Sequence, residues 1–146
     1  MADSKQINRL LSIKTMRRKL AELDAARANA RVSGAMAALS NARQDEQDII
    51  ITGDQRRENR ISELVNTPSN VPLQDTMIVN TFARTDFERD QARANVLQKT
   101  ANLGEARVAA AEKQQKLARF LQVEERAKQL CSRLEASEAL EAQRCE

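Results

Sequence analysis

Apolar side chains recur every three or four residues along most of this chain, which is the spacing of one face of an α-helix. In the first half, the predicted apolar face consists of Ile7, Leu10, Ile13, Met16, Leu20 and Leu23, then Ala28, Val32, Ala35, Leu39 and Ala42, and then Ile49, Ile61 and Leu64. In the second half, it consists of Leu73, Met77 and Phe82, then Ala94, Leu97, Ala101, Gly104, Val108 and Ala111, and then Phe120, Val123, Ala127, Leu130 and Leu134. Alternating steps of three and four residues are typical of coiled coils. The pattern therefore predicts two long helices that each bury one narrow face.

The only two prolines of the chain, Pro68 and Pro72, lie between the two series. Proline has no backbone N–H to donate, and it disfavours the helical conformation of the residue before it, so we expect Thr67 and Val71 to be non-helical. The sequence predicts a helix over about 4–66, a loop over 67–72 and a helix over about 73–145. We expect residues 1–146 to form a single elongated domain.

The two apolar series match when the chain is folded back at this loop. Residues that face each other in an antiparallel pair have numbers with a constant sum, and the series match at a sum of about 137. The predicted pairs are Ile7 with Leu130, Leu10 with Ala127, Met16 with Leu121, Leu20 with Leu117, Leu39 with Leu97, and Gly34 with Gly104. The predicted fold is therefore all-α, a long two-helix antiparallel coiled-coil hairpin.

The composition agrees with such a fold, since 31% of the residues are charged and only 2% are aromatic. Chains of this kind form long helices with a narrow apolar stripe and do not build a thick core. No stretch is long and apolar enough to span a membrane, and the N-terminus lacks the features of a signal peptide. We expect a soluble cytoplasmic protein without direct membrane insertion.

Residues that carry chemistry are few. The chain has no histidine, no glycine-rich phosphate loop and no Gly-x-Ser-x-Gly motif, and its two cysteines, Cys131 and Cys145, are too far apart in one helix to form a disulfide. A two-helix hairpin also has no concave pocket in which the pKa of a carboxylate would shift. We expect no enzymatic activity, no metal and no cofactor.

The first candidate site is a basic segment at the N-terminus. Residues 1–31 contain eight basic and three acidic residues, a net charge of +5, and the central cations are Lys14, Arg17, Arg18 and Lys19. One interpretation is a solvated face that pairs with the acidic segment 124–146, which has a net charge of −2. The other is a contact surface for an acidic partner. Nucleic acid is not expected, because the whole chain carries only +3 and no aromatic residues interleave the cations.

The second candidate site is apolar. The run Ile49-Ile50-Ile51 has three consecutive β-branched residues, whereas one helix face uses only one or two of them. The pairing places this run opposite Phe87, with Phe82 nearer the loop. Ile50, Ile51, Phe82 and Phe87 are therefore predicted to form either a small satellite core or an exposed site for a partner.

The chain resembles the type III secretion stalk family, which includes FliJ of flagella and the YscO-type proteins of injectisomes. The resemblance extends over the whole chain and rests on its length, its hairpin layout and the basic and aliphatic opening Ile7-Asn8-Arg9-Leu10-Leu11-Ser12-Ile13-Lys14. It implies a central stalk similar to the coiled coil of the rotary ATP synthase gamma subunit. The end with both termini would enter the pore of a hexameric secretion ATPase, and the loop end would reach the membrane-embedded export gate.

This resemblance also implies roles for the two candidate sites. Lys14, Arg17, Arg18 and Lys19 would contact the ATPase, and Ile50, Ile51, Phe82 and Phe87 would contact the cytoplasmic domain of the export gate. The expected protein is cytoplasmic and peripheral to the membrane-bound secretion apparatus, and it promotes assembly or activity of the ATPase ring without chemistry of its own. Two alternatives remain open at this point: a structural or scaffolding coiled coil, and an escort for small secreted proteins or their export chaperones.

Overall fold

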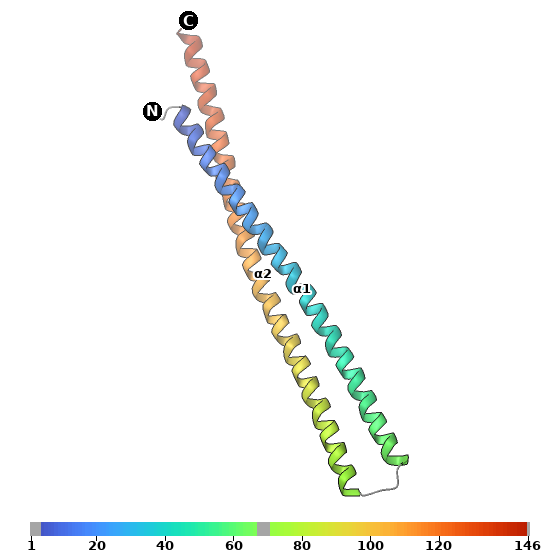
Figure 1. The fold of residues 1–146 in the computed structure, drawn as a ribbon. Coiled ribbons are helices and arrows are strands. Elements are labelled where there is room, and N and C mark those ends of the chain that lie inside the picture. The colour runs from blue at the N-terminus through green and yellow to red at the C-terminus, as the bar shows by residue number, and fades with distance from the viewer. Residues whose placement is uncertain (1–3, 67–70, 146) are drawn as a thin grey trace. The chain divides into compact units, whose positions relative to one another are not determined.

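The computed structural model describes residues 4–66 and 71–145, and these residues form two helices (Figure 1). Helix α1 spans Ser4–Asn66 and helix α2 spans Val71–Arg144. No strand occurs within the described ranges. The predicted all-α helical hairpin is therefore confirmed.

The two helices are continuous because almost nothing in their sequences interrupts a helix. Only three glycines occur in the chain, and no described residue has a positive φ. The expectation that Val71 is non-helical is wrong, because Val71 is the first residue of α2. Proline is tolerated in the first turn of a helix, where backbone N–H groups have no partner within the helix, so Pro72 does not delay the start of α2. Thr67 and most of the predicted loop lie outside the described residues.

The contacts between the helices gather into two units. We call residues 1–32 with 106–146 the terminal unit, and residues 33–105 the central unit. Each unit contains part of α1 and part of α2. The central unit is one contiguous stretch of chain, whereas the terminal unit combines two separate stretches. The prediction of a single domain stays a prediction.

In each unit α1 and α2 run antiparallel. Residues that come together are Ile7 with Cys131 and Ala28 with Lys113 in the terminal unit, and Gly53 with Thr85 and Arg60 with Thr81 in the central unit. As the residue number rises along α1, the number of the α2 residue beside it falls. The residue numbers of Gly53 and Thr85 add up to 138, one above the predicted sum of about 137.

The seam, meaning the positions of each helix that face the other helix, is narrow and consists mostly of small side chains. Its buried apolar residues are Ala21, Ala25, Ala28, Leu39, Ala42, Ala92, Leu103, Ala110 and Cys131. The predicted stretch from Ala28 to Ala42 is confirmed, since all five of its predicted positions are buried or half-buried. Small residues allow two helices to approach closely, so each unit can bury its seam without a thick core.

Other parts of the predicted seam are wrong. On α1, the exposed fraction is 47–64% for Leu10, Ile13, Met16, Leu20 and Leu23. On α2, it is 57–65% for Leu97, Val108 and Leu130. The first series advances in steps of three more often than the seam does, so it leaves the seam and follows a neighbouring face of α1. The predicted contact between Gly34 and Gly104 is also wrong, because a Cβ added at either position would have no neighbour within 4 Å.

Candidate partner-binding surfaces

A buried carboxylate lies at the seam of the terminal unit. Glu124 of α2 is only 3% exposed, and it accepts a hydrogen bond of 3.3 Å from the hydroxyl of Thr15 on α1. It also pairs with Arg18 across the seam and with Lys128 one turn along α2, at 3.1 Å. The carboxylate is thus surrounded by donors from both helices.

These donors keep Glu124 ionised. Burial by itself raises the pKa of Glu124, but the hydrogen bond from Lys128 and the positive charges of Arg18 and Lys128 outweigh burial and lower the pKa below the ordinary glutamate value. The pKa of Arg18 is raised, first by its hydrogen bond to Glu22 and also by the charge of Glu124. The pair therefore favours the charged form of both partners.

The structure separates the four predicted cations of the basic segment into different environments. Arg18 is engaged with Glu22 and Glu124, so its charge serves the contact between α1 and α2. Arg17 and Lys19 are exposed, and Lys14 is half-buried beside a groove. Arg18 thus pairs within the chain, whereas Arg17 and Lys19 face solvent, and a contact of these cations with a partner stays a prediction.

An apolar groove lies between α1 and α2 of the terminal unit, and we call it the terminal groove. It has a volume of about 470 Å³ and is lined by Ile7, Leu10, Leu11, Lys14, Val123, Arg126, Ala127, Leu130, Cys131 and Leu134. Two of the lining residues carry positive charge, and the remainder are apolar. Sequence reasoning missed this groove because it assigned Leu10 and Leu130 to the seam. In the structure both side chains line the groove and remain exposed.

The central unit has a polar contact at its own seam. Thr85 of α2 is only 1% exposed, and a Cβ added at Gly53 of α1 would lie 3.6 Å from its Cβ, so the two backbones approach closely here. Nε of Arg57 donates a hydrogen bond of 2.9 Å to the Thr85 hydroxyl, which itself donates to the carbonyl of Phe82 at 2.8 Å. The apolar pattern did not predict this contact, because Arg57 and Thr85 are polar residues of types that usually lie at the surface.

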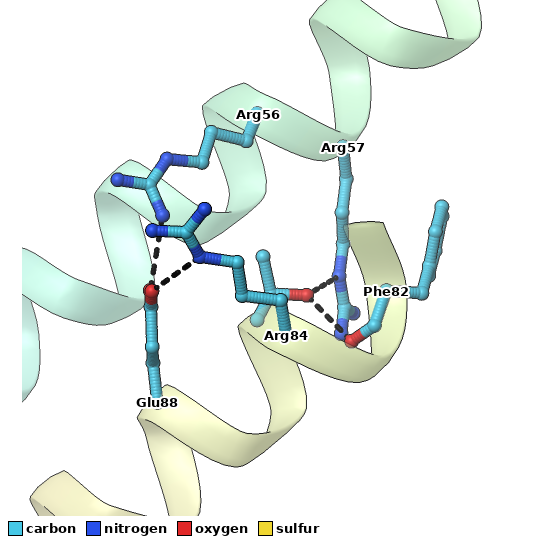
Figure 2. Close-up of polar contacts among 6 residues, drawn as sticks. Arg56, Arg57, Phe82, Arg84 and Glu88 are labelled. Carbon is cyan, nitrogen blue, oxygen red and sulfur yellow. Dashed lines mark hydrogen bonds and ion pairs between the residues drawn. The ribbon is translucent and has the colours of Figure 1, made fainter. Parts of the chain in front are cut away.

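The side chain of Arg57 extends from α1 to α2, where its guanidinium lies over the ring of Phe82 at 4.7 Å from the centroid (Figure 2). The same guanidinium also pairs with Asp86. Beside it, the carboxylate of Glu88 receives Arg56 from α1 at 3.0 Å and Arg84 from α2 at 3.1 Å (Figure 2). Exposed ion pairs each contribute little to stability, but several charged contacts across one stretch of seam favour a single register.

The four predicted apolar site residues fall into two environments. Ile50 and Phe82 are half-buried, whereas Ile51 is 56% exposed and Phe87 is 61% exposed. Ile51 precedes the buried Gly53 by two residues, and two residues correspond to a turn of about 200° around a helix. Phe87 follows the buried Thr85 by the same distance. Ile51 and Phe87 therefore point away from the seam, each on its own helix, and they do not cover each other as a satellite core would require.

Neither described helix contains a stretch apolar enough to cross a membrane. Within the same ranges, acidic and cysteine side chains do not gather in groups of three that could hold a metal ion.

Comparison with known proteins gives one informative match. No protein-family model matches the sequence, and neither does any curated protein. The structure is similar to the crystal structure of the type III secretion protein YscO from Vibrio parahaemolyticus, with a TM-score of 0.83. The match covers 96% of this chain and 87% of that chain at 21% sequence identity. The likeness confirms, at the level of the fold, the resemblance to YscO-type proteins.

Proposed function

We propose that this chain is a non-enzymatic component of a type III secretion system, in which it acts as the central stalk between the hexameric secretion ATPase and the export gate. The observation that carries the proposal is the likeness to YscO, because it extends over nearly the full length of both chains. A long helical hairpin is suited to contact other proteins along its surface. Its contribution would be to promote assembly or turnover of the ATPase ring and to transmit the state of the ring to the gate.

The terminal unit is the proposed contact for the ATPase. Arg17 and Lys19 are exposed cations on a stretch of α1 with a net charge of +5 over residues 1–31. Such a surface speeds the encounter with an acidic partner and orients it. Arg18 has a different role in this proposal, because its pairing with Glu124 supports the hairpin itself.

The central unit is the proposed contact for the cytoplasmic domain of the export gate. Ile51 and Phe87 are large apolar side chains that remain mostly exposed. Large apolar side chains in such positions are enriched where proteins bind each other. Ile50 and Phe82, which are half-buried, would contribute a smaller part of this contact.

The ATPase contact is tested by mixing the full chain with its cognate secretion ATPase and measuring ATP hydrolysis. We expect the chain to stimulate hydrolysis, and the double variant Arg17→Glu with Lys19→Glu to lower the stimulation by at least about threefold, because reversing exposed charges weakens association. The matched control is Arg43→Glu with Arg93→Glu, which reverses two exposed charges in the central unit. Circular dichroism checks that all variants remain helical.

Two results would contradict this part of the proposal. One is an ATPase rate that the wild-type chain does not change at any ratio. The other is an equal loss of stimulation in the test and control variants, which would mean that only the total charge matters.

A further inference from the structure

Four large aliphatic side chains of α1 remain exposed in the terminal unit and follow one another along the helix. They are Ile13, Met16, Leu20 and Leu23, and their exposed fractions are 47%, 64%, 62% and 47%. Their spacing of three, four and three residues is the spacing at which one helix packs its side chains between those of a second helix. We call these four residues the outer stripe. Apolar surface of this kind on a folded protein usually marks a place where a partner binds.

The outer stripe lies on a different side of α1 from the seam. At about 100° per residue, its mean direction is roughly 130° away from that of the buried residues Ala21, Ala25 and Ala28. From Ile13 to Leu23 it extends about 15 Å along the helix axis, at about 1.5 Å per residue. A second helix can therefore lie along the outer stripe without displacing α2 from the seam.

Cations surround the outer stripe. Arg17 and Lys19 lie about 80° to either side of its mean direction, and Arg9 and Arg27 lie in line with it, four residues before its first member and four after its last. All four cations are exposed, and none of them forms an ion pair within the described part of the chain. The nearest acidic residue of α1 is Asp24, which is half-buried on the same side as Arg17. The border of the stripe thus has four positive charges and one negative charge.

This border determines the chemistry of the partner. Exposed cations without a counter-charge attract and orient a partner that has carboxylates at matching positions. In pairs of packed helices, the charged residues on either side of the apolar stripe select the partner helix in this way. The partner that fits is therefore an amphipathic helix with aspartate or glutamate on both sides of its apolar stripe.

A second copy of this chain does not offer such a helix. If the outer stripes of two copies packed antiparallel, with Ile13 level with Leu23, then Arg17 would face Arg17 of the other copy and Lys19 would face Lys19 of the other copy. Like charges at these positions disfavour the pair. The exposed end of α2 over residues 132–145 is not a better match, because its three glutamates are offset by Arg133 and Arg144.

We propose that the outer stripe of α1 is the docking site for an acidic amphipathic helix of another protein. Met16 and Leu20 lie at the centre of the stripe and become buried between the apolar side chains of that helix, while Arg17 and Lys19 pair with its carboxylates. The inference deepens the proposed contact with the secretion ATPase and rests on the proposed function for the identity of the partner alone. The mode of docking follows from the residues of this chain.

The test uses the full chain and two fluorescently labelled helical peptides of about three heptads. Both peptides have leucine at the two apolar positions of each heptad, and the flanking positions are glutamate in the acidic peptide and lysine in the basic peptide. Fluorescence anisotropy measures the dissociation constant of each. We expect the acidic peptide to bind at least about tenfold more tightly than the basic peptide, and this preference to shrink as the salt concentration rises to about 1 M, because ions screen exposed charges.

Variants separate the apolar part of the site from its charged part. Leu20→Ser is expected to raise the dissociation constant of the acidic peptide at least about tenfold, because it removes a central apolar contact. The matched control, Leu97→Ser, changes a similarly exposed leucine of the central unit and leaves binding unchanged. Arg17→Glu with Lys19→Glu should reverse the preference, so that the basic peptide binds more tightly. Circular dichroism checks that each variant remains helical.

Three outcomes would overturn the proposal: no binding of the acidic peptide up to about 500 µM, equal binding of both peptides to the wild-type chain, or equal weakening by Leu20→Ser and Leu97→Ser. The assay contains no ATPase, so its result is separate from the hydrolysis measurement. Binding of the acidic peptide by a chain that does not stimulate the ATPase would support the docking site and refute the proposed partner. Stimulation of the ATPase without peptide binding would do the reverse.

Discussion

At the scale of single residues, the described part of each unit has one polar side chain that is buried in the seam and paired with an arginine from the other helix. In the terminal unit this residue is Glu124 with Arg18, and in the central unit it is Thr85 with Arg57. Burying such a group is costly unless its partner is present, so a shifted register would leave it unsatisfied. Polar seam residues of this kind specify how two helices align more than they increase stability.

The buried carboxylate predicts a specific dependence of stability on pH. Because the pKa of Glu124 is lowered in the folded chain, its stabilising effect is complete above the ordinary glutamate value of about 4.3 and is lost as the pH falls through the lower folded value. We expect Glu124→Gln to be less stable than wild type at pH 7, and this difference to shrink towards pH 3. Urea unfolding followed by circular dichroism at several pH values measures it.

The control for this experiment is Glu125→Gln, which changes the exposed neighbouring glutamate. Its stability should follow that of the wild type at every pH. If Glu124→Gln instead remained a constant amount less stable from pH 7 to pH 3, titration of Glu124 would not contribute to the stability of the hairpin.

At the scale of the helices, large and small apolar residues compete for the seam. The terminal half of α1 has one stripe with Leu10, Ile13 and Leu20, and a neighbouring stripe with Ala21, Ala25 and Ala28. The larger residues gave the stronger signal in the sequence, yet the smaller ones lie in the seam. Alanine lets the backbones approach, and the same phase of α1 brings Arg18 to Glu124. Periodicity alone cannot weigh a polar contact against apolar area.

Two leucines of α2 test which face lies in the seam. Leu103 is buried, whereas Leu97, which the apolar pattern placed in the seam, is 65% exposed. We expect Leu103→Ala to lower the free energy of unfolding by about 2 kcal/mol or more, because it removes buried methyl groups and leaves a cavity. Leu97→Ala should change it by less than about 0.5 kcal/mol. Urea unfolding gives both values, and a larger loss at Leu97 than at Leu103 would refute the observed seam.

At the scale of the whole molecule, the two units present different surfaces. The terminal unit combines exposed cations with an apolar groove, and the central unit exposes Ile51 and Phe87 among other large apolar side chains such as Val79 and Leu97. The proposed function therefore assigns one partner to each unit.

This assignment predicts that the two contacts can be removed separately. Ile51→Asp with Phe87→Asp should abolish capture of the cytoplasmic domain of the export gate and leave stimulation of the ATPase intact. Arg17→Glu with Lys19→Glu should have the opposite effect. Pull-down with the purified gate domain, run beside the hydrolysis assay, measures both in the same preparations, and Leu97→Asp serves as the apolar control. Loss of both activities in either variant would contradict separate contacts.

The sequence by itself determined that this chain forms an antiparallel hairpin of two long helices, because helix periodicity, few glycines and two central prolines act locally. It also identified the α1 side of the middle of the seam, from Ala28 to Ala42, but not the α2 side, where the predicted residues from Ala94 to Ala111 are exposed. Only the tertiary structure decided which face is buried near the termini, that Arg18 serves Glu124, and that Ile51 and Phe87 stay exposed. These features depend on side chains from both helices at once, so no pattern within one helix contains them.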